Sequence, residues 1–241
     1  MIGLLAATGA AALAAGTLLP GIYTNEEQVS FALEAGTPAP PWVGIEIKRE
    51  GDALRLLTID KFGAPGAESQ SIGLADEQGG VRVTMGRCQR LFEGQTDGRF
   101  INTNTKGTCD SPAALVTIGP AGLEMKMPDG TLLDLLRARM FRCWASLPRK
   151  DAKADWWFKS NVMLHDRGGR ALLETDEAEP QRFVIRMRNV VFPEPPNRPS
   201  LVLYVHSEDP VRAISYAWAD PEAKRLGINL RTMQASCSLQ E

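Results

Sequence analysis

The sequence predicts a mostly β protein, an antiparallel meander that closes as a barrel and is preceded by a short N-terminal helix. Short runs of alternating apolar and polar residues recur along most of the chain, and turn pairs such as Asp129-Gly130 separate them. The chain has 241 residues, of which 44% are hydrophobic and 23% charged, so it can bury a full core. Because barrels of about 200 to 250 residues often form one unit, we expect a single barrel-like domain over residues 20–241.

The first 19 residues carry no charged side chain, are rich in Ala, Leu and Gly, and end before Pro20. This composition is typical of a signal peptide, and Ala12-Leu13-Ala14 offers the small residues that a signal peptidase needs. The stretch has no Lys or Arg ahead of its apolar part. A retained membrane anchor is the alternative, but Gly and Thr residues dilute the apolar character that an anchor requires. We expect residues 1–19 to be a signal peptide and the protein to be periplasmic or secreted.

The chain has four cysteines, none of them in a C-x-x-C pair: Cys88, Cys109, Cys143 and Cys237. An even number in an exported chain favours two disulfide bonds over a metal site. Three pairings are possible, with free buried thiols as the alternative. We favour Cys88–Cys109, which would link neighbouring strands, together with Cys143–Cys237, which would tie the last strand to the middle of the sheet.

A short helix is predicted before the first strand. Thr24 and Glu27 have the spacing of a capping box, which predicts a helix from about Asn25 to Glu34 that ends at Gly36. Residues 37–41 are rich in proline and predict an extended connector.

The strands follow. Residues 43–48 and 53–59 alternate on either side of a Gly51 turn, which predicts a hairpin, and shorter runs follow at 81–84, 115–118 and 123–127. Residues 131–142 also fit a helical stripe, but the turn at Asp129-Gly130 favours a strand. Further strands are predicted at 182–188, 201–206 and 227–238.

Composition and motifs point away from several functions. The 27 basic and 29 acidic residues give a net charge of −2, which disfavours nucleic acids and anionic membranes as partners. The chain has no G-x-S-x-G elbow, phosphate-binding loop or dinucleotide fingerprint. Its two histidines, His165 and His206, are interpreted as a turn residue and a strand-end residue. We expect no catalytic residue, metal site or cofactor, although a Ser–His–Asp arrangement stays open because its members need not be adjacent in sequence.

Three segments resemble a known family. The residues from Gly21 to Gln28, which read GIYTNEEQ, resemble the opening of the CpcT/CpeT-type phycobiliprotein chromophore lyases. Gly86-Arg87-Cys88 with Cys109, and the Asp-Arg-Gly turn after His165, resemble later parts of that family, so the likeness covers residues 21–175. The matching positions are Tyr23, Asn25, Gln28, Cys88, Cys109, Asp166, Arg167 and Gly168, most of which we interpret as structural. The resemblance implies a lipocalin-like barrel with an interior pocket, but not bilin attachment, because an exported chain would not meet the antenna proteins.

The leading hypothesis is an exported calycin-like protein that binds a small, partly apolar ligand without transforming it. Small-ligand pockets combine aromatic walls with a few polar groups, although plain core packing is the alternative for any single aromatic residue. The candidate ligand-binding residues are Tyr23, Asn25, Gln28, Trp42, Trp156, Arg186, Tyr204 and His206. The alternatives are a chromophore-lyase-like protein that handles a tetrapyrrole, and an envelope interaction module that uses outward aromatics and the proline-rich residues 192–199. No stable membrane insertion is expected, and the oligomeric state stays open.

Overall fold

The computed structural model describes residues 10–51, 53–109, 113–150, 155–193, 198–207 and 212–240. The chain divides into two compact units. The barrel unit contains Met1–Asp60 and Ala64–Arg137, and the two-sheet unit contains Lys61–Gly63 and Ala138–Glu241. The structure therefore differs from the single domain that we expected over residues 20–241.

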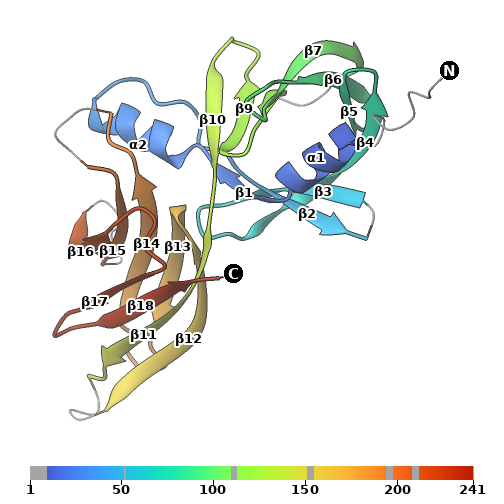
Figure 1. The fold of residues 1–241 in the computed structure, drawn as a ribbon. Helices are drawn as coiled ribbons and strands as arrows, with labels where there is room; N and C mark the ends of the chain where they lie inside the picture. Colours follow the sequence, from blue (N-terminus) through green and yellow to red (C-terminus); the bar gives the residue numbers. More distant parts are fainter. Residues whose placement is uncertain are drawn as a thin grey trace. The chain divides into compact units, whose positions relative to one another are not determined.

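The barrel unit is built from ten antiparallel strands that close on themselves (Figure 1). They are β1 (Gly21–Thr24), β2 (Gly44–Glu50), β3 (Ala53–Ile59), β4 (Pro65–Glu77), β5 (Gly80–Met85), β6 (Cys88–Gly94), β7 (Phe100–Gly107), β8 (Ala114–Ile118), β9 (Gly122–Lys126) and β10 (Leu132–Arg137). Each strand from β2 to β9 pairs with the next one along the chain, and β1 closes the barrel by pairing with both β2 and β10. The predicted antiparallel barrel is confirmed, as is the strand expected in residues 131–142.

Alternation decides which side chains enter the barrel. On β5, Val81, Val83 and Met85 are buried, and on β10, Leu133 and Leu135 are fully buried. Because successive side chains of a strand point to opposite faces, these residues share the interior face. The barrel core thus arises from local period-two patterns that the sequence already shows.

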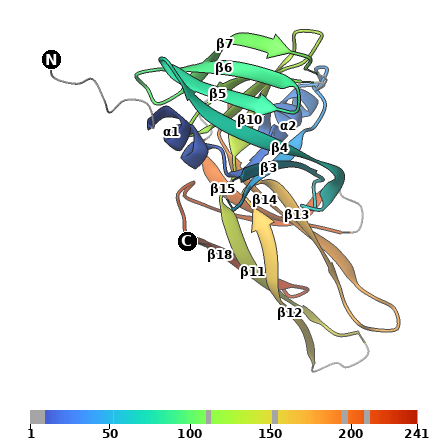
Figure 2. The ribbon, with the colours of Figure 1, turned by 90° about the vertical axis from the view of Figure 1, so that its right-hand side faces the viewer.

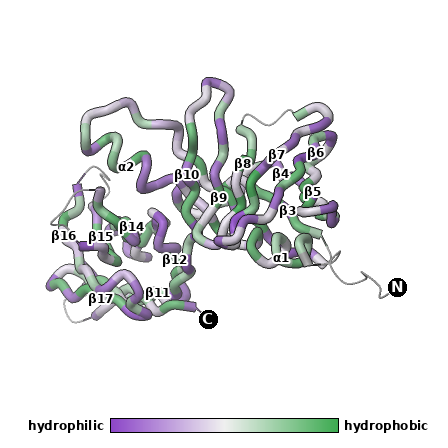
Figure 3. Tube along the Cα trace, turned by 45° about the horizontal axis from the view of Figure 1, so that its top comes forward, coloured by the Kyte–Doolittle hydropathy of each residue, from purple (hydrophilic) through white to green (hydrophobic). Residues whose placement is uncertain are grey.

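Two helices belong to the barrel unit: α1 (Ala10–Leu18) and α2 (Glu26–Glu34). Helix α1 contacts β4 and β5, beside which it lies in Figure 2. Its residues carry no charge, and Figure 3 colours it in green and pale shades. Ala15 and Leu19 are fully buried in the barrel core. The later half of the expected signal peptide is therefore packed on the barrel, while residues 1–9 lie outside the described residues. No helix in the described parts of the chain is long and apolar enough to cross a membrane.

Helix α2 confirms the predicted helix, but not the predicted cap. Its N-cap residue is Asn25 rather than Thr24, which belongs to β1, and Asn25 makes no side-chain cap hydrogen bond. The Asn25 side chain instead donates to the Pro41 carbonyl at 2.8 Å and accepts from the Val43 amide at 2.7 Å. Asn25 thereby fixes the connector between α2 and β2.

The two-sheet unit contains two four-stranded antiparallel sheets. One sheet has the order β12 (Trp156–His165), β11 (Met140–Pro148), β18 (Gln234–Leu239), β17 (Arg225–Asn229), and the other has the order β13 (Arg167–Glu174), β14 (Arg182–Val190), β15 (Ser200–His206), β16 (Ala213–Ala219). Buried residues of both sheets, such as Phe141, Leu147, Ile185 and Leu203, form one core. This unit has its own core because the barrel is already closed when the chain leaves β10.

Both favoured disulfide bonds are confirmed, and each lies inside one unit. Cys88 and Cys109 are bonded in the barrel unit, and Cys143 and Cys237 are bonded in the two-sheet unit. Cys143 and Cys237 stand directly opposite each other on β11 and β18. The second bond therefore ties the C-terminal strand to the strand that opens the two-sheet unit.

Candidate functional site

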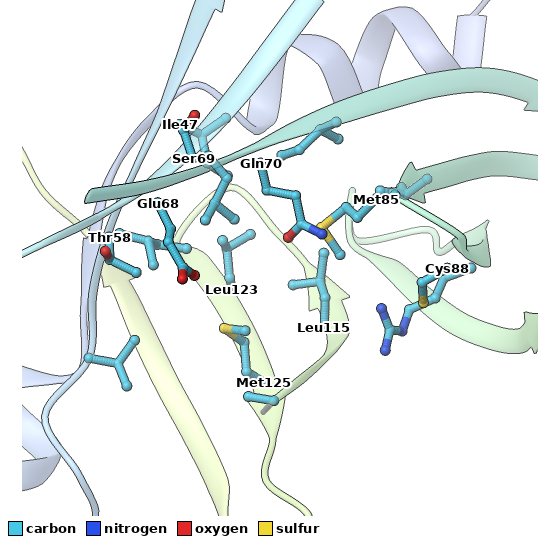
Figure 4. A pocket seen from close by; sticks show the side chains of 18 of the residues that line it. Ile47, Thr58, Glu68, Ser69, Gln70, Met85, Cys88, Leu115, Leu123 and Met125 are labelled. Carbon is cyan, nitrogen blue, oxygen red and sulfur yellow. The ribbon is translucent and has the colours of Figure 1, made fainter. Parts of the chain in front are cut away.

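The barrel encloses a cavity of about 600 Å³. Its apolar wall is formed by strands β2 to β5 on one side and by β8 and β9 on the other. The apolar lining residues on these strands are Ile45, Ile47, Leu56, Ile72, Val83, Met85, Leu115, Leu123 and Met125. Figure 4 shows Met85, Leu115, Leu123 and Met125 gathered around a common space. Inward alternation on the barrel strands thus produces an apolar wall with room left inside it.

Polar side chains mark one side of this cavity. Thr58, Glu68, Ser69 and Gln70 line it from β3 and β4, and all four are exposed. Because they contact both the cavity and solvent, they indicate where the cavity opens. Figure 4 shows Gln70 beside Met85, with its amide directed toward the cavity.

Arg90 is the buried charged residue of the cavity lining. It lies on β6 between Cys88 and Phe92, and the burial pattern places all three on the interior face. Arg90 is only 4% exposed, and its Nη1 atom has no hydrogen-bond partner among the residues that the structure describes. Removal from water lowers the pKa of the Arg90 guanidinium from its ordinary value, since burial penalises the charged form. An arginine nevertheless keeps its charge at neutral pH.

Tyr23 lies in the barrel unit but is not part of the cavity lining. Its buried hydroxyl lies 2.7 Å from the Leu18 carbonyl oxygen and 3.0 Å from the Leu19 carbonyl oxygen, at the end of α1. Burial raises the pKa of Tyr23, while the nearby positive charge of Arg137 opposes this shift. Arg137 also lies over the Tyr23 ring and donates to the carbonyls of Leu18 and Pro20. Tyr23 therefore anchors the end of α1.

The other predicted residues near the N-terminus are also bonded within the barrel unit. Gln28 donates to the Leu132 carbonyl at 2.8 Å and accepts from the Asp134 amide at 3.2 Å, which fastens α2 to β10. Trp42 donates its indole N–H to Glu26 at 2.6 Å. Asn25, Gln28 and Trp42 are not among the residues that line the cavity.

Three predicted residues meet in the two-sheet unit. Arg186 lies opposite Tyr204 across β14 and β15, with its guanidinium 5.8 Å from the centre of the tyrosine ring. The rings of Tyr204 and His206 are 6.2 Å apart, and Tyr216 on β16 lies 6.2 Å from Tyr204. Trp156 stands apart from this group, at the start of β12, and is 42% exposed. Four of the eight predicted residues thus lie in the barrel unit and four in the two-sheet unit, where Trp156 is apart from the other three.

The resemblance to chromophore lyases also named Asp166, which lies between β12 and β13. Its carboxylate is 1% exposed and accepts hydrogen bonds from the Arg139 Nε at 2.7 Å and the Arg139 backbone amide at 2.8 Å. These bonds join the starts of β11 and β13, which gives Asp166 a structural role. Within the described residues, no cluster of three His, Cys, Asp or Glu side chains could hold a metal ion.

Outward aromatic residues of the kind invoked for an interaction module occur on β16. Tyr216 and Trp218 are 61% and 70% exposed, and the aliphatic Ile214, which is 52% exposed, alternates with them on the same face. In the proline-rich segment named with them, residues 194–197 lie outside the described residues.

Arg90 and the cavity methionines were missed at the level of sequence. The signal was nevertheless present, because Cys88, Arg90 and Phe92 occupy alternate positions of one run. A charged residue flanked on the same face by two apolar ones is a candidate for an interior site.

Comparison with known proteins gave no match to this chain among family models, curated proteins or solved structures.

Proposed function

We propose that the barrel unit binds a small, partly apolar molecule in its cavity without transforming it. The observation that carries this proposal is the cavity itself, whose volume is about 600 Å³. Pockets for small molecules typically have about 300 to 1,000 Å³ and combine an apolar wall with a few polar groups. The lining of this cavity has the same composition.

The lining also suits a ligand of adaptable shape. Three methionines, Met85, Met125 and Met127, face the cavity. Methionine side chains are unbranched and polarisable, so they adjust to irregular apolar surfaces. Filling the cavity would remove apolar surface of both partners from water, which supplies the driving force for binding.

The two disulfide bonds indicate that the protein folds in an oxidising compartment. We infer from this that the ligand is met in the periplasm or outside the cell. This inference is tested by measuring the free thiols of the protein after periplasmic and after cytoplasmic expression. A cytoplasmic protein that binds its ligand with all cysteines reduced would contradict it.

A neutral solvatochromic dye such as Nile red tests the binding proposal. The dye should bind with a blue-shifted emission, and 1-decanol should displace it. Met125→Trp should weaken both interactions, because a larger side chain would occupy the cavity. Lys126→Trp is the matched control, since Lys126 follows Met125 on β9 and is exposed.

Absence of dye binding, or equal loss in the two tryptophan variants, would refute the proposal. The chromophore-lyase-like alternative is tested with the same variants by measuring the absorption spectrum of an added tetrapyrrole. A bound spectrum for protoporphyrin IX that Met125→Trp abolishes would favour that alternative.

A further inference from the structure

Arg90 is a buried charge for which the described residues provide no partner. Three other arginines of the barrel unit, Arg55, Arg82 and Arg99, each form an ion pair with a carboxylate at the surface. Arg90 has no ion pair or hydrogen bond of its side chain within the part of the chain that the structure describes, and its Nη1 is buried without an acceptor. Burying an unpaired charge is costly, because the group loses its hydration and gains nothing in return.

The position of Arg90 makes this cost relevant to ligand binding. Arg90 lines the cavity together with Val83, its direct neighbour across β5 and β6. Glu68 is the carboxylate among the described lining residues, and it is exposed on β4 rather than paired with Arg90. The charged side chains among the described lining residues are those of Glu68, Arg87 and Arg90, and of these only Arg90 is buried.

We propose that the natural ligand is an amphiphile with one carboxylate head group, which pairs with the Arg90 guanidinium while its hydrocarbon part contacts the apolar wall. This inference rests on the proposed binding function and names its ligand class. A carboxylate presents two acceptor oxygens in the plane of the guanidinium fork, so the pair can form two parallel hydrogen bonds. A single carboxylate also balances the one positive charge of Arg90, whereas a phosphate monoester would bring nearly two negative charges.

The remaining lining fits the other end of such a molecule. Met85, Leu115, Leu123 and Met125 surround the space shown in Figure 4 and offer no hydrogen-bonding side chain stronger than a thioether. A hydrocarbon chain satisfies this wall, while a second polar group there would lose its hydration without compensation. The cavity thus offers one buried group that can bind an anion, Arg90, and a larger apolar region.

The test compares decanoate, 1-decanol, decylammonium and decyl phosphate as competitors of bound Nile red. The wild type should bind decanoate about tenfold or more tightly than 1-decanol, and decylammonium most weakly, because charge-assisted bonds are the strongest of these contacts. Arg90→Met should bring the decanoate to decanol ratio close to one. Arg55→Met is the matched control, since it removes the same charge from an exposed site and should leave the ratio unchanged.

The outcomes separate this inference from the proposed function. If Nile red and 1-decanol bind but Arg90→Met keeps the wild-type preference, the inference is wrong and the binding function stands. Tighter binding of decyl phosphate than of decanoate would likewise overturn the carboxylate head. If neither dye nor decanol binds, the proposed function itself fails.

A second measurement covers the case in which Arg90→Met does not fold. Carbon-13 NMR of carboxyl-labelled decanoate bound to the wild type should show a carboxyl pKa below that of the free acid, since a facing guanidinium favours the charged form. Burial in an apolar pocket alone would raise this pKa, so a raised value contradicts the pairing. Arg90→Lys, which keeps the charge, should retain the preference for decanoate over 1-decanol.

Discussion

Replacing Asp166 by alanine should strongly destabilise the two-sheet unit. The Asp166 carboxylate is 1% exposed and accepts hydrogen bonds from the Arg139 side chain at 2.7 Å and from the Arg139 amide at 2.8 Å. Asp166→Ala removes both acceptors at once. It leaves the Arg139 guanidinium, whose side chain is 25% exposed, without its buried partner.

The size of the effect follows from the burial of the two groups. Breaking a buried ion pair by removing one partner costs about 3 to 5 kcal/mol. Arg139 is partly exposed and keeps an exposed partner in Glu222 at 3.2 Å, so the lower end, about 3 kcal/mol, is expected. With a urea dependence of about 1 to 3 kcal/mol per molar, the unfolding midpoint should fall by roughly 1 to 3 M.

Tryptophan fluorescence during urea unfolding measures this change in the relevant unit. Four of the five tryptophans belong to the two-sheet unit: Trp144, Trp156, Trp157 and Trp218. Glu222→Ala is the control, because Glu222 pairs with the same arginine but its side chain is 83% exposed, and its loss should cost below about 1 kcal/mol. An Asp166→Ala midpoint no lower than that of Glu222→Ala would refute the reasoning.

Three further predictions concern the bonds, the glycine packing and the titration of the fold. Removing the Cys143–Cys237 bond, whose cysteines are 94 residues apart, should lower the free energy of unfolding by roughly 4 to 5 kcal/mol. Removing Cys88–Cys109, with a separation of 21, should lower it by about 3 kcal/mol. Equal urea midpoints for the two double alanine variants would contradict this order. Gly80→Ala should cost about 1 to 3 kcal/mol in thermal unfolding, because its Cβ would overlap the Phe92 carbonyl, whereas Gly73→Ala, with no contact closer than 3.6 Å, should be tolerated. Burial raises the pKa of Tyr23, so the unfolded chain loses the tyrosine proton at a lower pH than the folded chain does. The free energy of unfolding should therefore fall as pH rises above about 10. Tyr23→Phe should lessen that fall, and an unchanged pH dependence in this variant would count against the reasoning.

The sequence by itself determined many of the strands and the barrel class, because these depend on patterns close together in the chain. Period-two alternation predicted the hairpin of β2 and β3, and the turn at Asp129-Gly130 predicted the strand β10. The sequence allowed three cysteine pairings, and the one that we favoured is confirmed by both bonds. The predicted capping box at Thr24 is wrong. Thr24 pairs with Gly44 and Leu136 in the barrel, so it belongs to a strand and does not begin the helix.

The tertiary structure alone decided where the barrel closes and what its interior contains. Alternation marks a strand but does not select its partners, so the pairing of β1 with both β2 and β10, which ends the barrel at Arg137, was not readable from the sequence. The cavity is likewise a property of many side chains together, namely the volume that they leave unfilled. Arg90 became a candidate only when the structure showed that none of the described residues places an acceptor beside Nη1, and this depends on residues distant in the chain.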